Sequence, residues 1–164
     1  MDLYILRHAI AGDRESFDGP DSERPLTKEG ARKMKRIAKE LRKLDIKFDV
    51  ILSSPFVRAR ETAEIMAKQF HSENILKLSS HLEVGGDPAA LIHEINTSYK
   101  KFDRILLVGH EPYLSGLISM LVSGRTELSI TMKKGGICKL SIASLRYDRC
   151  ATFEWLRAPG QIIR

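Results

Sequence analysis

Short apolar runs alternate along this chain with longer segments in which apolar residues recur every three or four positions. Residues 3–6, 50–52 and 105–108 are uninterrupted apolar runs of three or four residues. Runs of this kind are typical of strands buried on both faces of a parallel sheet. Two further strands are predicted at residues 137–142 and 152–156, near the carboxyl end of the chain.

Helical periodicity fills most of the segments between these runs. After Thr27, a predicted N-cap, an apolar stripe with helical spacing is flanked by basic residues, although Gly30 at the third helical position is unfavourable. The stripe consists of Ala31, Met34, Ile37, Ala38, Leu41 and Leu44, and the basic residues are Arg32, Lys33, Lys35, Arg36, Lys39, Arg42 and Lys43. A second helix is predicted to carry Ala59, Ala63, Met66, Ala67 and Phe70 on one face. Two more are predicted at 88–99, begun by Asp87 or Pro88, and at 113–122.

Short strands that alternate with helices indicate the α/β class. We expect a three-layer sandwich in which helices flank a mostly parallel central sheet. The chain contains no internal repeat and no Pro/Gly-rich linker long enough to separate two units. Residues 1–164 are therefore expected to form a single domain.

The composition is that of an ordinary globular protein, with 43% hydrophobic and 29% charged residues. No apolar run approaches the roughly 20 residues that span a membrane, and no signal peptide is apparent at the start. We therefore expect a cytoplasmic protein without a membrane partner. The net charge of +6 favours anionic partners. Nucleic acid is not expected among them, because no aromatic residues interleave the basic helix for base stacking.

Neither the cysteines nor three of the histidines show the spacing of a metal site. Cys138 and Cys150 have no nearby ligand partners and are expected to be free thiols. His71, His81 and His93 lack HxH or HExxH spacing. We expect no metal or other cofactor. Similarly, the lone tryptophan, Trp155, alternates with its neighbours as a core strand residue does.

Polar residues, most of them arginine or histidine, follow three of the predicted strands. They are Arg7 and His8, Ser54 followed by Arg58, and His110 after Gly109. Because ligand sites of open α/β sheets lie beyond the carboxyl ends of the strands, we expect these side chains to converge. One guanidinium group can donate two parallel hydrogen bonds to two phosphoryl oxygens. A neutral imidazole can attack phosphorus to form a covalent intermediate. The residues alone leave open which histidine attacks.

Four segments carry a family resemblance: "LRHA", "LTKEG", "SSPFVRARETA" and "VGHEP", in this order. Together they resemble the histidine phosphatase superfamily, whose hallmark is Arg-His-Gly after the first strand. Ala9 departs from that hallmark by one methyl group. The resemblance implies a fold like that of phosphoglycerate mutase.

The resemblance also implies roles for individual residues. His8 is expected to accept the phosphoryl group, and Arg7, Arg58 and His110 to form the phosphate pocket. The second ring nitrogen of His8 is expected to donate to a backbone carbonyl, which fixes its tautomer. Ser54 matches a family position near the pocket and is counted among the phosphate-binding residues, although a strand-end cap explains it equally well. Thr27 matches another such position, while Arg60 is expected on the surface, because i and i+2 residues of a helix do not share a face.

Two candidates for the proton donor to the leaving group lie in "HLEVGGDP". Glu83 stands where larger members of the superfamily keep their acid, and Asp87 is the alternative. Histidine leaves phosphohistidine as an imidazole whose conjugate acid has a pKa of about 6.5, so that a phosphohistidine phosphatase needs little help from an acid.

Chain length narrows the expected substrate. Only about 42 residues separate Thr62 from the strand at residue 105, which leaves little for a lid over the pocket. The length, "RPLTKEG" and "MKKGGICKL" are similar to the SixA-type phosphohistidine phosphatases. We expect hydrolysis of a protein phosphohistidine, such as that of a histidine-containing phosphotransfer domain in signal transduction, with the basic helix helping to dock it. The alternatives are a phosphatase of small phosphomonoesters and a non-hydrolytic phosphoryl-relay or phosphate-binding module. The oligomeric state is left open.

Overall fold

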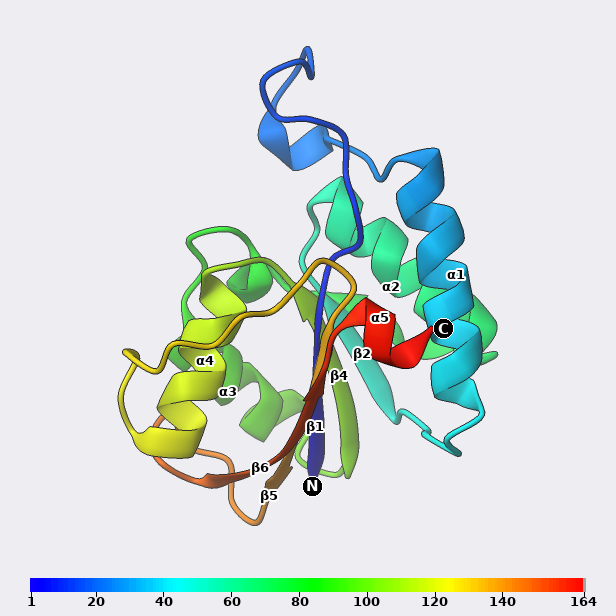
Figure 1. Cartoon of the computed structure of the whole chain (residues 1–164). Helices are drawn as coiled ribbons and strands as arrows, with labels where there is room; N and C mark the ends of the chain where they lie inside the picture. Colours follow the sequence, from blue (N-terminus) through cyan, green and yellow to red (C-terminus); the bar gives the residue numbers. More distant parts are fainter. Residues whose placement is uncertain (164) are drawn as a thin grey trace.

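A single mixed sheet of six strands forms the centre of the computed structural model, which describes residues 1–163 (Figure 1). The strand order is β3-β2-β4-β1-β5-β6. Their bounds are β1 Asp2–Arg7, β2 Val50–Ser53, β3 Leu76–Leu78, β4 Arg104–Gly109, β5 Ile137–Ile142 and β6 Ala151–Arg157. The first four are parallel, whereas β5 and β6 run antiparallel to their neighbours. This agrees with the predicted mostly parallel sheet.

Helices cover both faces of the sheet and complete the three layers (Figure 1). They are α1 Lys28–Arg42, α2 Val57–Gln69, α3 Pro88–Ser98, α4 Tyr113–Ser123 and α5 Pro159–Ile162. Three 3-10 turns join them: η1 Asp21–Glu23, η2 Glu73–Ile75 and η3 Ser80–Leu82. Successive residues of β1 point to opposite faces, so that Leu3 and Ile5 pack with α3 and α4, while Tyr4 and Leu6 pack with α1 and α2. The middle residues of the central strands are therefore apolar on both faces.

Helix α1 begins as predicted and ends earlier than its apolar pattern. The Thr27 hydroxyl accepts a hydrogen bond from the N–H of Gly30 at 2.9 Å. Gly30, which seemed unfavourable, is required here because a Cβ at this position would overlap the carbonyl oxygen of Ile10. The prediction that Leu44 continues the buried stripe is wrong. The helix ends at Arg42, and Leu44 lies beyond it, 49% exposed.

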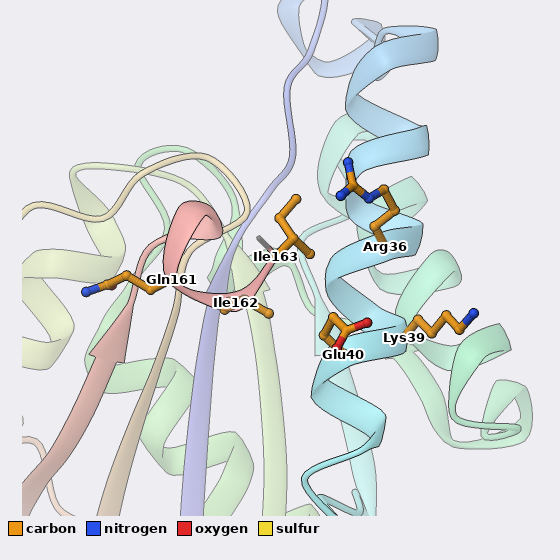
Figure 2. Close-up of a pocket in the computed structure, with 6 residues that line it drawn as sticks. All are labelled: Arg36, Lys39, Glu40, Gln161, Ile162 and Ile163. Carbon is orange, nitrogen blue, oxygen red and sulfur yellow. The ribbon is translucent and has the colours of Figure 1, made fainter.

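Strand β6 contributes to the core, whereas helix α5 packs beside α1. Trp155 on β6 lies 6.2 Å from the ring of Tyr4 and packs against the core, as expected. Helix α5, which the sequence pattern did not predict, lies beside α1, with Ile163 directed toward it and Gln161 pointing away (Figure 2). Both cysteines are free. Among residues 1–163, no helix has the length and apolar character needed to cross a membrane.

Parallel strands bring three chain segments to one edge of the sheet. β4 pairs with both β1 and β2, so that the ends of these strands lie side by side. The hydrogen bonds continue past the strands: the N–H of His8 donates to Gly109 O at 3.0 Å, and that of Ser54 to Val108 O at 2.9 Å. The residues that follow each strand therefore start from fixed backbone positions.

Candidate active site

Four side chains gather at this edge, and we refer to them as the His8 cluster: Arg7, His8, Arg58 and His110. Arg7 ends β1, His8 and His110 directly follow β1 and β4, and Arg58 is the second residue of α2. The imidazole rings of His8 and His110 lie 5.2 Å apart. His8, Arg58 and His110 are only 5%, 3% and 2% exposed. Three separate strand-to-helix connections thus deliver cationic or titratable groups to one shielded place.

The ring of His8 is held in one tautomer by its own loop. Its Nδ1 lies 2.8 Å from the carbonyl oxygen of Ala9, an acceptor that requires a proton on Nδ1. Nε2 therefore carries the free electron pair. Burial lowers the pKa of His8 to about 3, assisted by the charges of His110, Arg58 and Arg7 and opposed by the hydrogen bond to Ala9. The side chain is consequently neutral at physiological pH, with a lone pair on Nε2 that could attack an electrophile.

The ring of His110 is held by Ser54, and its hydrogen bonds lead us to assign the opposite tautomer. Its Nε2 lies 2.8 Å from the Ser54 hydroxyl, whose oxygen also accepts the N–H of Phe56 at 3.2 Å. Because the Ser54 hydroxyl has no other hydrogen-bond acceptor among residues 1–163, we assign its proton to the bond with Nε2 and the ring proton to Nδ1. The Phe56 ring packs edge-on against His110. Burial, with the charge of Arg58, lowers the pKa of His110 to about 4. The hydroxyl of Ser54, which was expected to bind phosphate, is thus hydrogen-bonded to His110 and to the backbone of Phe56, and it orients His110.

The two arginines are each anchored through one side of the guanidinium group. Arg7 Nη1 donates to Met132 O at 2.8 Å. Arg58 donates from Nη1 to Asp21 O at 2.8 Å and from Nη2 to Asp21 Oδ2 at 2.9 Å. Burial lowers the pKa of both guanidinium groups, against the influence of Glu111 on Arg7 and of Asp21 on Arg58. These hydrogen bonds use only the Nη atoms and leave the Nε of each guanidinium group without a hydrogen-bond partner.

Sequence reasoning missed Asp21, which also binds a second arginine. Its Oδ1 accepts from Arg24 Nε at 3.0 Å, and Arg24 Nη1 donates to Gly12 O at 2.6 Å. Although burial opposes it, hydrogen bonds from Arg24 and Arg58 hold the pKa of Asp21 below its ordinary value. The i,i+3 spacing of Asp21 and Arg24 was the signal available in the sequence.

Thr62 is a second missed residue, and it links the loop after His8 to α2. It is fully buried. Its hydroxyl accepts the N–H of Ala9 at 3.0 Å and donates to Arg58 O at 2.7 Å. One side chain thereby fixes the backbone beside both His8 and Arg58.

The two acid candidates differ in what already holds them. Asp87 Oδ1 caps α3 by accepting from the N–H groups of Ala89 and Ala90 at 2.9 and 3.2 Å. Glu83 directly follows η3 and is half-buried. The preceding Leu82 approaches the end of β4, since a Cβ at Gly109 would contact its carbonyl oxygen. Glu83 thus starts from a backbone position close to the carboxyl end of β4.

Unpartnered polar atoms are concentrated in the His8 cluster. Among residues 1–163, four buried side-chain nitrogen or oxygen atoms have no hydrogen-bond partner, and three of them are Arg7 Nε, Arg58 Nε and His110 Nδ1. The fourth is the hydroxyl of Tyr113. Leaving a buried donor without an acceptor costs about 1–3 kcal/mol, so that three such donors beside His8 favour an anionic ligand with several oxygens.

The other titratable residues form no second centre of this kind. In the described part of the chain, no three His, Cys, Asp or Glu side chains lie together as a metal site would require. Arg60 pairs with Glu64 on the surface of α2. Thr27 caps α1, and its hydroxyl also lies 3.4 Å from Ile10 O.

Known proteins of similar sequence point to one superfamily. A family model described as the histidine phosphatase superfamily (branch 1) matches residues 3–84. The chain belongs to this superfamily. It is also 33% identical, over 153 residues covering 89% of this chain and 88% of the relative, to an uncharacterized protein of Picosynechococcus sp.. As a histidine phosphatase, it is a hydrolase of phosphorylated substrates.

Two further similarities concern proteins called SixA. Phosphohistidine phosphatase SixA of Escherichia coli K12 is 26% identical over 162 residues, covering 97% of this chain and 94% of that protein. The structure of the protein histidine phosphatase SixA complexed with tungstate matches with a TM-score of 0.83, at 24% identity and 98% coverage of both chains. The structural match extends the common fold over nearly the whole histidine phosphatase chain.

Proposed function

We propose that this histidine phosphatase removes the phosphoryl group from a phosphohistidine in a protein, through a covalent intermediate on His8. The observation that carries the proposal is the set of three unpartnered donors, Arg7 Nε, Arg58 Nε and His110 Nδ1, beside a histidine whose Nε2 carries a free electron pair. The similarity to the phosphohistidine phosphatase SixA supports the choice of substrate. The tungstate held in the similar SixA structure, an oxyanion, supports the choice of ligand chemistry.

In the first step, Nε2 of His8 attacks the phosphorus atom opposite the leaving imidazole. The bond between phosphorus and the substrate nitrogen breaks as the bond to Nε2 forms. With its second nitrogen protonated, the substrate leaves as neutral imidazole. The transferred group keeps its three equatorial oxygens, whose charge the two guanidinium groups and the His110 N–H stabilise in the transition state.

In the second step, water attacks the phosphoryl group on His8. The bond between phosphorus and Nε2 breaks, neutral His8 is regenerated, and dihydrogen phosphate carries both protons of the water molecule. The hydrogen bond from Nδ1 to Ala9 O persists through both steps and stabilises the positive charge that the ring carries while phosphorylated.

The rate of ester hydrolysis should depend on a proton donor such as Glu83. An alkoxide leaving group needs a proton, which we assign to Glu83 because Asp87 already caps α3. A phosphatase of small phosphomonoesters is therefore the nearest alternative, and it requires Glu83 as a working acid. The neutral imidazole that leaves phosphohistidine requires none.

A non-hydrolytic relay is the alternative of another class. In that reading His8 holds a phosphoryl group and passes it to another acceptor instead of to water. The phosphorylated protein would then persist in water, whereas a phosphatase intermediate turns over. We propose the signalling role and the cytoplasmic location expected from the sequence together with hydrolysis of phosphohistidine.

The test compares wild type with His8→Ala on a phosphohistidine peptide and on a panel of phosphomonoesters. His93→Ala is the matched control, because His93 is exposed on α3. We expect His8→Ala to release no phosphate, and wild type to show an acid-labile phosphoenzyme during turnover. Normal phosphate release by His8→Ala, or rapid hydrolysis of esters without that of phosphohistidine, would contradict the proposal.

A further inference from the structure

A basic groove borders the His8 cluster at Arg7. It encloses about 680 Å³, and one of its walls is formed by α5. The groove is lined by Arg7, Ile10, Lys33, Lys133, Lys134 and residues 158–161. Lys133 and Lys134 belong to the loop before β5, and Lys33 to α1. Three separate segments therefore contribute the cations that surround it.

The loop that carries two of the lysines is tied directly to the nucleophile strand. Its residue Met132 accepts the hydrogen bond from the Arg7 guanidinium. The N–H of Gly135, a residue with φ of 79°, lies 3.1 Å from the carbonyl oxygens of both Arg7 and His8. Lys133 and Lys134 lie between these two attachments. Their backbone positions are consequently fixed relative to the phosphoryl acceptor.

Lys33 is placed by the close approach of α1 to the loop after His8. Gly30 packs against the carbonyl of Ile10, and the N–H of Thr27 donates to the same oxygen at 3.0 Å. Lys33 follows Gly30 by three residues and so shares its face of the helix. Lys33 is thus the basic residue of α1 that lines the groove.

The charge of this groove is of one sign. Its lining contains four cationic side chains and no carboxylate. Within residues 1–163, no ion pair joins Lys33, Lys133 or Lys134 to an acidic residue. The neighbouring hollow on the other side of α5 includes Glu40 beside its basic residues (Figure 2). The groove between α1 and α2 likewise contains Glu61 and Glu64.

We propose that the basic groove binds acidic residues that flank the phosphohistidine in the protein substrate. The inference rests on the proposed function, because a phosphohistidine that reaches His8 brings its own neighbouring residues to Arg7. Unpaired cations at that place favour carboxylates in the approaching chain and raise the rate of encounter. The groove thereby selects the partner by its charge, while the His8 cluster performs the chemistry.

The test uses two phosphohistidine peptides of equal length, one flanked by Asp and Glu and the other by Ser and Gln. The measured quantity is the ratio of their kcat/KM values at low ionic strength, which cancels any common effect on phosphoryl transfer. We expect wild type to prefer the acidic peptide by about fivefold, as two exposed ion pairs allow. Lys133→Glu/Lys134→Glu should abolish or invert that preference.

The matched control is Lys35→Glu/Lys68→Glu, which changes the net charge equally in the groove between α1 and α2. The control should retain the preference, and circular dichroism should show that both variants are folded. Equal use of the two peptides by wild type, or loss of the preference in the control as well, overturns the docking inference alone. If no phosphohistidine peptide is hydrolysed, the proposed function and the docking inference fall together.

A phosphomonoester with a second phosphate group provides a further arm. If its kcat/KM falls in Lys133→Glu/Lys134→Glu while the peptide ratio stays the same, the groove binds anionic small molecules, and the docking of an acidic protein segment is overturned.

Discussion

Lowering the pH should destabilise this protein through two buried histidines. The perturbation is a change from pH 7 to pH 5, compared between wild type and the double variant His8→Gln/His110→Gln. Burial lowers the pKa of His8 to about 3 and that of His110 to about 4, whereas an imidazole in the unfolded chain titrates near 6.5. Between about pH 4 and 6.5 the unfolded chain therefore binds more protons than the folded protein.

The magnitude follows from linkage between protonation and folding. Because the unfolded state binds the additional protons, the free energy of unfolding falls as the pH falls through this window. At pH 5 each histidine contributes a loss of about 2 kcal/mol relative to pH 7, and the pair about 4 kcal/mol. That loss is a large part of the 5–15 kcal/mol by which domains are ordinarily stable.

The assay is urea unfolding at several pH values between 5 and 8. Carboxylates titrate alike in wild type and variant, so that the difference between the two pH profiles isolates the histidines. His93→Gln on the exposed face of α3 should leave the wild-type profile unchanged. If the double variant loses as much stability as wild type between pH 7 and pH 5, the two imidazoles are not held neutral by burial, and the reasoning fails.

Three substitutions test the support of the cluster. Ser54→Ala removes the hydroxyl that holds His110 in its Nδ1–H tautomer and should lower kcat about fivefold, on the basis of about 1 kcal/mol for one hydrogen bond. An unchanged kcat in steady-state assays would refute that role. Thr62→Val deprives the N–H of Ala9 of its acceptor and should lower the free energy of unfolding by about 1–3 kcal/mol in urea titrations, with Thr62→Ser restoring it. Glu83→Gln should slow the hydrolysis of phosphomonoesters more than that of phosphohistidine, and equal losses would contradict the leaving-group argument.

Elements with a strong internal pattern were predictable from the sequence. The central strands are buried on both faces, and their apolar runs record that burial directly. Helix α1 was predicted by its stripe and its Thr27 cap. The edge strand β3 was missed because it has three residues and is largely exposed, and α5 because a four-residue helix has no periodicity.

The cluster could be anticipated in part for a similar reason. Residues directly after parallel strands share one edge of the sheet, which brings Arg7, His8 and His110 together without knowledge of side-chain positions. The support of the cluster depends on contacts between residues far apart in sequence. Asp21 reaches Arg58 across 37 positions, and Thr62 reaches Ala9 across 53, and neither contact has a local pattern.

The acceptor for the His8 ring proton is a main-chain oxygen, which every amino acid supplies in the same place. The loop's contact with Thr62 is also made through main-chain N–H. Alanine at position 9, in place of the glycine of the family hallmark, therefore leaves both attachments of the His8 loop in place, and its methyl group joins the apolar core. Relatives with other small residues after the histidine should accordingly keep the same geometry at this loop.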